Sequence, residues 1–405
     1  MKFLFKQSYD DDIKLLKHSG YIRASAFFFL LAALLPIYFM WAGVDATTLK
    51  HVIHILILSI CASGLMILTG FTGQVSLGHG AFFALGAYGM HFLLKMGVPW
   101  HFSFFLTPLI IGLFGYIIAR PTLRMSGVTL AITTLLFMLF IEQAFKQWGV
   151  MGGGNGFKTP KFSDKESWFF FVFQPIAAAL TDHDPENRRD VLLLARSASK
   201  YALYYGALLT LVFVIWIMNN LVRSRLGRTL IAIRDSEVSA RSMGVHLNHY
   251  KSLSMGLSAA IGALAGIFNS YNDGFVSPES VNFITSIVLL LIVVVGGLGS
   301  IHGAIFGAIT YVFLREILFP ELADFFQAWA NNGGGQVAES LAWFFNIGGL
   351  GDIFFAALVL LILFYEPLGL YARWKKTEAF FQTFPFYRAG TFKRQRSYNK
   401  TERLK

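Results

Sequence analysis

The segment 281–318, VNFITSIVLLLIVVVGGLGSIHGAIFGAITYVFLREIL, contains two long apolar runs separated by a short glycine-rich break. A helix rises about 1.5 Å per residue, so about 20 apolar residues cross a hydrocarbon core roughly 30 Å thick. The runs 281–297 and 302–318 approach that length, and both are hydrophobic on almost every face, as expected of helices that contact lipid. They predict two membrane-crossing helices joined by a tight turn.

The rest of the chain repeats this pattern. Of its 405 residues 55% are hydrophobic and only 14% are charged, whereas soluble domains carry about 25% charged residues. The mean hydropathy is +0.56. The sequence therefore predicts an all-α, polytopic inner-membrane helical bundle with about ten transmembrane helices. The predicted spans are 24–43, 51–69, 79–95, 103–119, 127–146, 200–222, 252–270, 281–297, 302–318 and 352–371.

Basic residues set the predicted orientation, because lysine and arginine accumulate on the cytoplasmic side of a membrane. With the N-terminus inside, 23 of the 34 basic residues fall in the cytoplasmic segments 1–23, 120–126, 223–251 and 372–405. In the external loop 147–199 basic residues are balanced by acidic ones, and the external loop 319–351 has no basic residue. Both termini are predicted to be cytoplasmic, flanking a transmembrane domain at 24–371.

The tail 372–405 is strongly basic, with ten lysine and arginine residues. Each basic residue near an anionic membrane surface is worth about 1 kcal/mol of attraction. Contact with membrane lipids is the first interpretation of this tail, and contact with a partner protein is the alternative. The net charge of +11 is thus explained by membrane topology and gives no reason to expect nucleic acid as a partner.

The cytoplasmic segment 223–251 is the most charged part of the transmembrane region. Within it, the spacing predicts a short helix over Ser236–Met243. Asp235 is the expected N-cap, Glu237 suits the first turn, and Gly244 is placed to end the helix. A short capped helix on a tight tether can be moved as a rigid body, although the same charges also fit an ordinary cytoplasmic loop.

Two polar patches interrupt the apolar runs and are candidates for a translocation path or gate. Backbone broken by glycine is tolerated at membrane depth only inside protein or facing water. A plain cytoplasmic turn is the alternative for each patch. The first comprises Thr72, Gln74, Ser76 and His79, and the second comprises Gly296, Gly297, Gly299, Ser300 and His302.

Small residues recur every four positions in three places and predict close helix packing. The first ladder includes Gly262 and Gly266, and the second includes Gly303 and Gly307. Each ladder fits static packing, a dimer seam or a sliding surface. In addition, HGAFFALGAY (79–88) resembles HGAIFGAITY (302–311), which indicates either an internal repeat or a coincidence of small-residue helices.

Charged residues are almost absent from the predicted spans, which limits the possible functions. A charge at a helix centre costs about 2.5–3.5 kcal/mol on insertion scales. Glu142, Arg315 and Glu316 lie near predicted outer ends. With no predicted midplane carboxylate or histidine, an ion-coupled secondary carrier is disfavoured. Scattered histidines and a single cysteine, Cys61, likewise disfavour an intramembrane enzyme or a cysteine metal cluster.

Four motifs together resemble one family. They are TGFTGQVSLGHGAFFALGAYG (69–89), GGGNG (152–156), GRTLIAIRDSEVSARSMGV (227–245) and VVVGGLGSIHGAIFGA (293–308). Their order and spacing resemble LivM-type permeases, the membrane subunits of branched-chain amino acid ABC importers and of related urea and short-amide importers. The resemblance covers roughly residues 50–370. The segment 227–245 resembles the coupling loop of ABC-importer permeases, whose pattern is Glu-Ala-Ala-x-x-x-Gly. Ala240 and Gly244 keep the Ala-to-Gly spacing of this pattern, whereas Glu237 lies one residue too far upstream and Ser239 replaces the first alanine.

The resemblance implies a non-catalytic subunit without cofactors of its own, located in the bacterial cytoplasmic membrane. The chain lacks the G-x-x-x-x-G-K-[ST] loop that holds nucleotide phosphates, so ATP and magnesium are expected on two cytoplasmic ATP-binding subunits. A homologous LivH-like permease and a periplasmic solute-binding protein complete the expected complex. Branched-chain amino acids are the first expected substrates, with urea or short amides as the alternative. The residues expected to contact the ATPase are Arg228, Arg234, Asp235, Ser236, Glu237, Ala240, Arg241 and Gly244.

Overall fold

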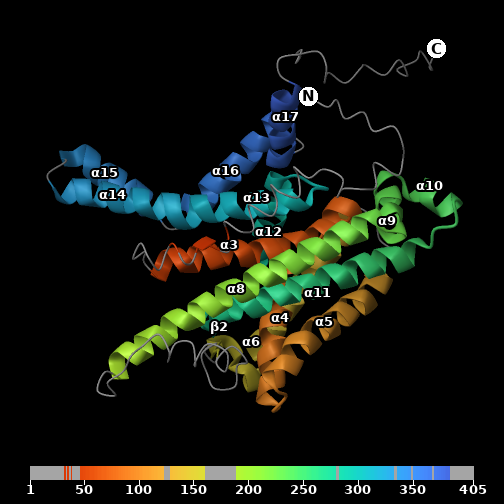
Figure 1. Cartoon of the computed structure of the whole chain (residues 1–405), viewed down its shortest axis with the longest axis horizontal. Helices are drawn as coiled ribbons and strands as arrows, with labels where there is room; N and C mark the ends of the chain where they lie inside the picture. Colours follow the sequence, from red (N-terminus) through yellow and green to blue (C-terminus); the bar gives the residue numbers. More distant parts are fainter. Residues whose placement is uncertain are drawn as a thin grey trace.

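The computed structural model is an elongated helical bundle, with α9 and α10 at one end and the α14–α15 hairpin projecting at the other (Figure 1). It confirms the predicted all-α class, apart from two-residue strands β1 (Phe157–Lys158) and β2 (Phe275–Val276), which pair antiparallel. The residues that the structure describes are 32, 34, 35, 38, 46–122, 128–159, 188–279, 282–332, 335–347, 350–366 and 369–383.

The helices follow the apolar runs of the sequence. Their bounds are α3 Ala46–Leu65, η2 Met66–Phe71, α4 His79–Lys95, α5 Trp100–Thr122, α6 Val128–Gln147, η3 Gly149–Met151, η4 Gly153–Asn155, α8 Arg188–Arg223, α9 Arg225–Asp235, α10 Glu237–Ser242, α11 Leu247–Asp273, α12 Phe283–Gly296, α13 Ile301–Val312, η5 Phe313–Leu318, α14 Phe319–Asn331, α15 Gly335–Phe345, α16 Leu350–Tyr365 and α17 Leu370–Thr383. The segments η2 and η5 are π-helical, a rare geometry found mostly at functional sites.

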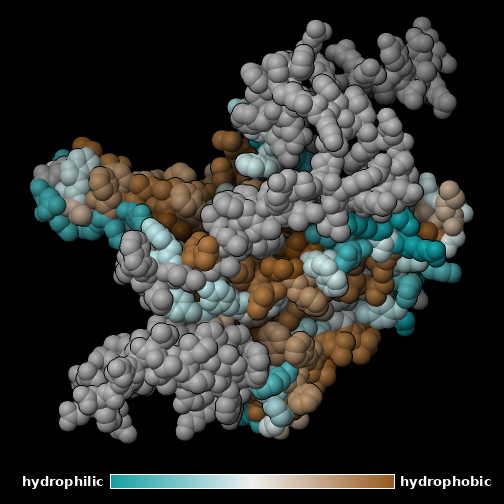
Figure 2. Space-filling model, in the orientation of Figure 1, coloured by the Kyte–Doolittle hydropathy of each residue, from teal (hydrophilic) through white to brown (hydrophobic). Residues whose placement is uncertain are grey.

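Helices α3 and α11 form the centre of the bundle. Their most apolar stretches are 83% and 72% buried, compared with 28% for α6 at the periphery. Helices α5, α6 and α8 carry exposed side chains such as Phe105, Phe140 and Trp216. Figure 2 shows hydrophobic side chains over the middle of the molecule and hydrophilic ones around α9 and α10. An apolar belt between polar ends is the surface that a bilayer requires.

Glycines allow the closest helix contacts. A Cβ added to Gly266 of α11 would lie 1.9 Å from the backbone oxygen of Phe83 in α4, and one added to Gly262 would lie 2.9 Å from His79 Nε2. In the α12–α13 hairpin, a Cβ on Gly307 would lie 1.9 Å from the oxygen of Ile292, and one on Gly303 would lie 2.7 Å from the oxygen of Gly296. Both ladders therefore face helices of this same chain.

The observed helices reproduce many of the predicted spans. Helix α4 has the predicted limits 79–95, and six continuous helices in the described part of the chain are long and apolar enough to cross a membrane. A seventh span results if α15 and α16, which meet at 77°, count as one. The predicted span 24–43 lies largely outside the described residues, although residues 32, 34, 35 and 38 are helical.

In three places the observed helices extend beyond the predicted spans or end before them. The segment 319–351 is mostly helical, because α13, η5 and α14 form one helix over Ile301–Asn331 and α15 follows. Helix α8 begins at Arg188, inside the segment 147–199, and its membrane-spanning stretch Lys200–Arg223 matches the predicted span 200–222. The predicted span 352–371 is broken after Tyr365, before α17 begins. In each case the apolar stretch was identified correctly, but the observed helix does not have the same length as the apolar stretch.

Candidate functional site

The charged segment after α8 folds into two short capped helices. Ser224 breaks α8 from α9, and its hydroxyl accepts a hydrogen bond from the amide of Gly227. The predicted N-cap of α10 was wrong by one residue: Ser236, rather than Asp235, caps it by accepting from the amide of Ser239 at 3.2 Å. The Asp235 carboxylate instead accepts hydrogen bonds from the Arg234 guanidinium at 3.1 and 3.2 Å. Both residue types are good caps, and this local pairing leaves Ser236 in the role.

An ion pair fixes α10 to the central helix. Glu237, in the first turn of α10, lies 2.7 Å from the ammonium group of Lys251 in α11, and the Lys251 side chain is only 4% exposed. Gly244 has a φ of +84° and its amide donates to the oxygen of Arg241, so it ends α10 at the predicted position. Sequence reasoning missed Lys251, because its partner becomes apparent only once the two helices fold back on each other.

Two apolar side chains at α10 are open to solvent among its exposed polar residues. Val238 is 82% exposed and Met243, at the end of the helix, is 86% exposed, whereas Ala240 is buried between them and the bundle. Beneath α10, Leu230 and Ile233 bury the inner face of α9. The result is a small rigid projection with two apolar tips, which is a surface suited to contact with another protein.

Arg234 joins this projection to both polar patches. Its Nη1 donates to the backbone oxygen of Gly70 at 3.1 Å, at the end of η2. A Cβ on Gly73 would lie 2.9 Å from Arg234 Cγ, and one on Gly299 would lie 3.4 Å from Arg234 Nη1. Arg228, by contrast, donates to the nearby oxygen of Arg223, and Arg241 is exposed. Within the predicted coupling set, Arg234 is thus the residue that reaches the two polar patches.

The first polar patch is a break in the helical path deep inside the bundle. After η2 the chain runs without helix from Thr72 to Gly78, and the Thr72 hydroxyl donates to the oxygen of Ile67 at 2.8 Å. Gly78 packs against the backbone of Thr134, seven residues into α6, and the amide of Leu77 donates to the Thr134 hydroxyl at 3.0 Å. Helix α4 therefore starts inside the bundle, and its first residue, His79, is fully buried.

The second patch lies beside the first. The Gly299 amide donates to the Met66 sulfur at 3.1 Å, and Ser300 caps α13 by accepting from the Gly303 amide. Gly297, with a φ of +116°, packs against Gly369 at the start of α17. The His302 ring stacks on Tyr371 with 5.6 Å between ring centroids. The patches and Arg234, which come from separate parts of the sequence, thus meet in one place.

Two buried side chains of the first patch carry polar atoms without partners. His79 is fully buried, and within the described part of the chain neither ring nitrogen has a hydrogen-bond partner. The same is true of the Gln74 side-chain nitrogen. Ser76 is also buried, and its hydroxyl accepts a long hydrogen bond of 3.4 Å from the Gly78 amide. Leaving a buried polar group unpaired costs about 1–3 kcal/mol, so each case calls for an explanation.

At the opposite end of the bundle the structure gathers polar residues that sequence reasoning misplaced or missed. Arg315 and Glu316 do not lie at the end of a helix: the π-helical turn η5 carries the helix on into α14, so they are midway along Ile301–Asn331. Glu316 accepts hydrogen bonds from His51 and His54 of α3. The spacing of two histidines on one helix face was the available signal, but their partner is 262 residues away from His54.

Comparison with known proteins agrees with this architecture. Residues 47–363 match the family described as branched-chain amino acid transport system / permease component. The high-affinity branched-chain amino acid transport system permease protein LivM of Salmonella typhimurium is 33% identical over 71% of this chain and 68% of its own length.

Two further relatives extend the comparison. LivM of Escherichia coli is 32% identical over 71% of this chain and 66% of its own length, so the chain spans about two thirds of each LivM relative. LivH of Salmonella typhimurium, also a permease protein, is 24% identical over 46% of this chain and 58% of its own length. No solved structure matches the chain significantly.

Proposed function

Because the chain belongs to the family of permease components of branched-chain amino acid transport systems, we propose that it lines the path through which an ATP-driven importer moves branched-chain amino acids into the cell. As a permease component it is a multi-pass membrane protein whose task is transport. The proposed substrate class is that of the LivM relatives; urea or short amides are the alternative. An ion-coupled carrier is disfavoured by family membership.

We infer a topology of ten spans with both termini in the cytoplasm. The six long apolar helices, the bent α15–α16 pair and the shorter helices α4 and α12 support nine of these spans. The predicted helix at 24–43 would be the tenth. The domain organisation that follows has a cytoplasmic segment at 1–23, a transmembrane permease domain at 24–371 and a basic cytoplasmic tail at 372–405, in the bacterial cytoplasmic membrane.

The observation that carries the mechanism is the contact of Arg234 with Gly70 and Gly299. Movement of α10 by an ATP-hydrolysing partner would pass through α9 to the hinge between η2 and the 72–78 break. Because these segments are not held by regular helical hydrogen bonds, they can shift at a lower cost than intact helices. Arg234 is therefore the proposed link between nucleotide-driven motion and the gate.

The proposed complex contains a LivH-like permease, two cytoplasmic ATP-binding subunits and a periplasmic solute-binding protein. Similarity to both LivM and LivH relatives supports a pair of related permeases. No cofactor is proposed on this chain; ATP and magnesium would be bound by the partner subunits. Exposed apolar side chains on α5, α6 and α8 offer surfaces for lipid and for the second permease.

Uptake into vesicles tests the proposed function. The chain, a LivH-like permease, both ATPases and the solute-binding protein are reconstituted together, and radiolabelled leucine, urea and acetamide are supplied in turn with ATP. We expect accumulation of leucine that requires ATP and every component. Accumulation against a gradient by this chain alone would refute the proposal, and uptake of urea or acetamide instead of leucine would establish the alternative substrate class.

Replacing His79 with leucine tests the gate. The leucine side chain has a volume similar to that of the imidazole, and the substitution removes two buried nitrogens without hydrogen-bond partners in the described part of the chain. The thermal stability of the purified chain should therefore be unchanged or higher. If the imidazole serves the solute path, leucine uptake should nevertheless fall about tenfold or more. Cys61→Ala, another small change at a fully buried position, provides the control. Normal uptake by His79→Leu would assign His79 to packing alone.

A further inference from the structure

A cavity of about 560 Å³ opens at the end of the bundle opposite α10. It lies among the N-terminal turns of α3 and α12, the C-terminal end of α11, and η5. Helix α11 begins beside α10 and ends at the cavity; its 27 residues, at about 1.5 Å each, separate the two sites by about 40 Å. In the proposed topology the cavity faces the outside, from which solute arrives. Its size is within the usual range of small-molecule sites, about 300–1,000 Å³.

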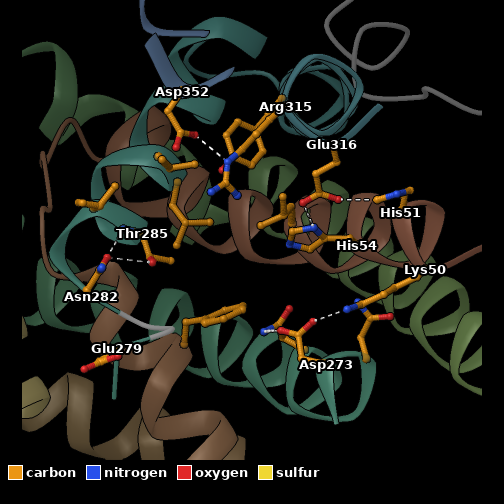
Figure 3. A pocket seen from close by; sticks show the side chains of 18 residues that line it. Lys50, His51, His54, Asp273, Glu279, Asn282, Thr285, Arg315, Glu316 and Asp352 are labelled. Carbon is orange, nitrogen blue, oxygen red and sulfur yellow. Dashed lines mark hydrogen bonds and ion pairs between the residues drawn. The ribbon is translucent and has the colours of Figure 1, made fainter. Parts of the chain in front are cut away.

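Charged side chains of both signs surround the cavity (Figure 3). Arg315 forms an ion pair with Asp352, with 2.7 Å between Nε and Oδ1, and its guanidinium points into the space. Beside it, Glu316 of the same π-helical turn is held by His51 at 2.9 Å and His54 at 2.6 Å. The two contacts between Glu316 and the histidines are hydrogen bonds. Within the described ranges, no group of His, Cys, Asp and Glu side chains is arranged to hold a metal ion.

Asp273 completes the ring of charges. It pairs with Lys50 at 3.3 Å and accepts a hydrogen bond from the Asn269 amide at 2.9 Å. The lining residues include two lysine or arginine side chains and four carboxylates, so the cavity has an excess of negative charge when its histidines are neutral. Such a site repels free anions and favours a ligand with a cationic group.

Part of the cavity lining is apolar. Leu58, Phe83, Val288 and Leu289, which come from three different helices, are among the lining residues. A ligand that fits must therefore combine a small hydrocarbon group with a cationic group. The guanidinium of Arg315 adds a place for a carboxylate, because its fork matches carboxylate geometry. These three features together fit an α-amino acid with an apolar side chain, and similarity to the LivM relatives makes the branched-chain amino acids the first candidates.

We propose that this cavity is a binding site in which the permease itself recognises the zwitterion of such an amino acid. Arg315 binds the α-carboxylate, and the α-ammonium lies between Glu316 and Asp273. A carboxylate offers about four acceptor positions, so both acids can accept another donor beside the contacts they already make. His51 and His54 are positioning residues that hold Glu316. The proposal rests on the proposed function, and it adds selection by the permease to any selection made by the solute-binding protein.

Equilibrium binding to the purified complex without solute-binding protein and without nucleotide tests the site. Radiolabelled leucine is the probe, and leucinamide, 4-methylpentanoate and 3-methylbutylamine are the competitors. Leucinamide keeps the ammonium and lacks the charged carboxylate; 4-methylpentanoate lacks the ammonium. We expect leucine to bind and each analogue to compete at least tenfold less well, with the anionic 4-methylpentanoate the weakest because of the excess negative charge. Absence of leucine binding, or equal competition by all analogues, would overturn the proposal.

Substitutions assign the two charged groups of the ligand. Arg315→Gln should weaken leucine binding at least tenfold and leave leucinamide binding within about twofold, whereas Glu316→Gln should weaken both. Arg120→Gln, at the other end of the bundle, is the matched arginine control and should change neither. If Arg315→Gln weakens leucine and leucinamide equally, Arg315 serves only to hold Asp352, and the assignment is refuted. ATP-driven leucine uptake by the wild-type complex is measured in parallel: uptake without this binding pattern rejects the site and keeps the proposed function.

Discussion

Replacing Val238 and Met243 together with aspartate is expected to detach the permease from the proposed ATP-binding subunit and abolish ATP-driven uptake. The two side chains are 82% and 86% exposed on a helix that is otherwise anchored to the bundle. Burying each in a partner would contribute about 1.5–3 kcal/mol, and about 1.4 kcal/mol corresponds to a tenfold change in affinity. Two such losses predict association at least about 100-fold weaker, measured by co-purification and by titration of the ATPase onto permease in nanodiscs.

The matched control lies at the other end of the molecule. Val150, in the proposed external loop 147–199, is also exposed, so Val150→Asp places an aspartate on the same residue type outside the predicted spans and matches one half of the α10 pair. It should leave ATPase association unchanged, and both variants should be inserted and folded equally well, since neither position is buried. If the α10 variant still binds the ATPase with wild-type affinity, α10 is not the docking element, and coupling must run through another cytoplasmic surface.

Most of the fold was predictable because membrane-crossing helices can be recognised in the sequence by the length and apolarity of their segments. The run 79–95 gave the limits of α4 to the residue, since Gly78 precedes it and Lys95 ends it. The same criterion did not identify α14, because this helix is amphipathic and carries too few apolar residues to be recognised as a membrane span. Pro320 does not end the helix at that point. In the structure it lies in the first turn of α14, just after η5, where a proline is tolerated in place of a hydrogen-bond donor.

The candidate site was predictable in its parts and not in its assembly. Glycine-broken polar patches and a charged insert stand out locally, and the structure describes all of them. That Arg234 contacts Gly70 across 164 residues of sequence, or that Met66 contacts Gly299 across 233, follows only from how α3, α9 and α13 pack. The outer cavity was missed for the same reason. Arg315 and Glu316 were predicted to lie near the outer end of one span, but the sequence does not show that the fold gathers them around a cavity with residues of α3, α11 and α16.

Replacing Gly266 with leucine is expected to prevent the chain from folding. Any Cβ at this position would lie 1.9 Å from the backbone oxygen of Phe83 and 3.2 Å from the amide nitrogen of Ala87. Neither backbone atom can rotate away, so α4 and α11 would have to separate along the contact that also buries His79 and Gly86. Overpacking a core usually costs about 1–3 kcal/mol even when side chains can adjust, and total stability is commonly about 5–15 kcal/mol. A clash with backbone atoms should therefore remove much of the free energy that stabilises the folded chain.

The measurement is the yield of monodisperse protein in detergent, followed by the thermal denaturation midpoint of that protein. A control variant at a second helical glycine separates the effect of a backbone clash from the general cost of substituting a glycine. Gly206 of α8 is also a helical glycine, but a Cβ there would lie 3.3 Å from a ring carbon of Phe268, a side chain that can move. Gly206→Ala should therefore fold nearly normally, while Gly266→Ala should already be strongly destabilised and Gly266→Leu should give no folded protein. Equal behaviour of the two alanine variants would mean that α4 and α11 can part without loss of the fold, and the 72–78 break would then lose the rigid frame on which its role as a gate depends.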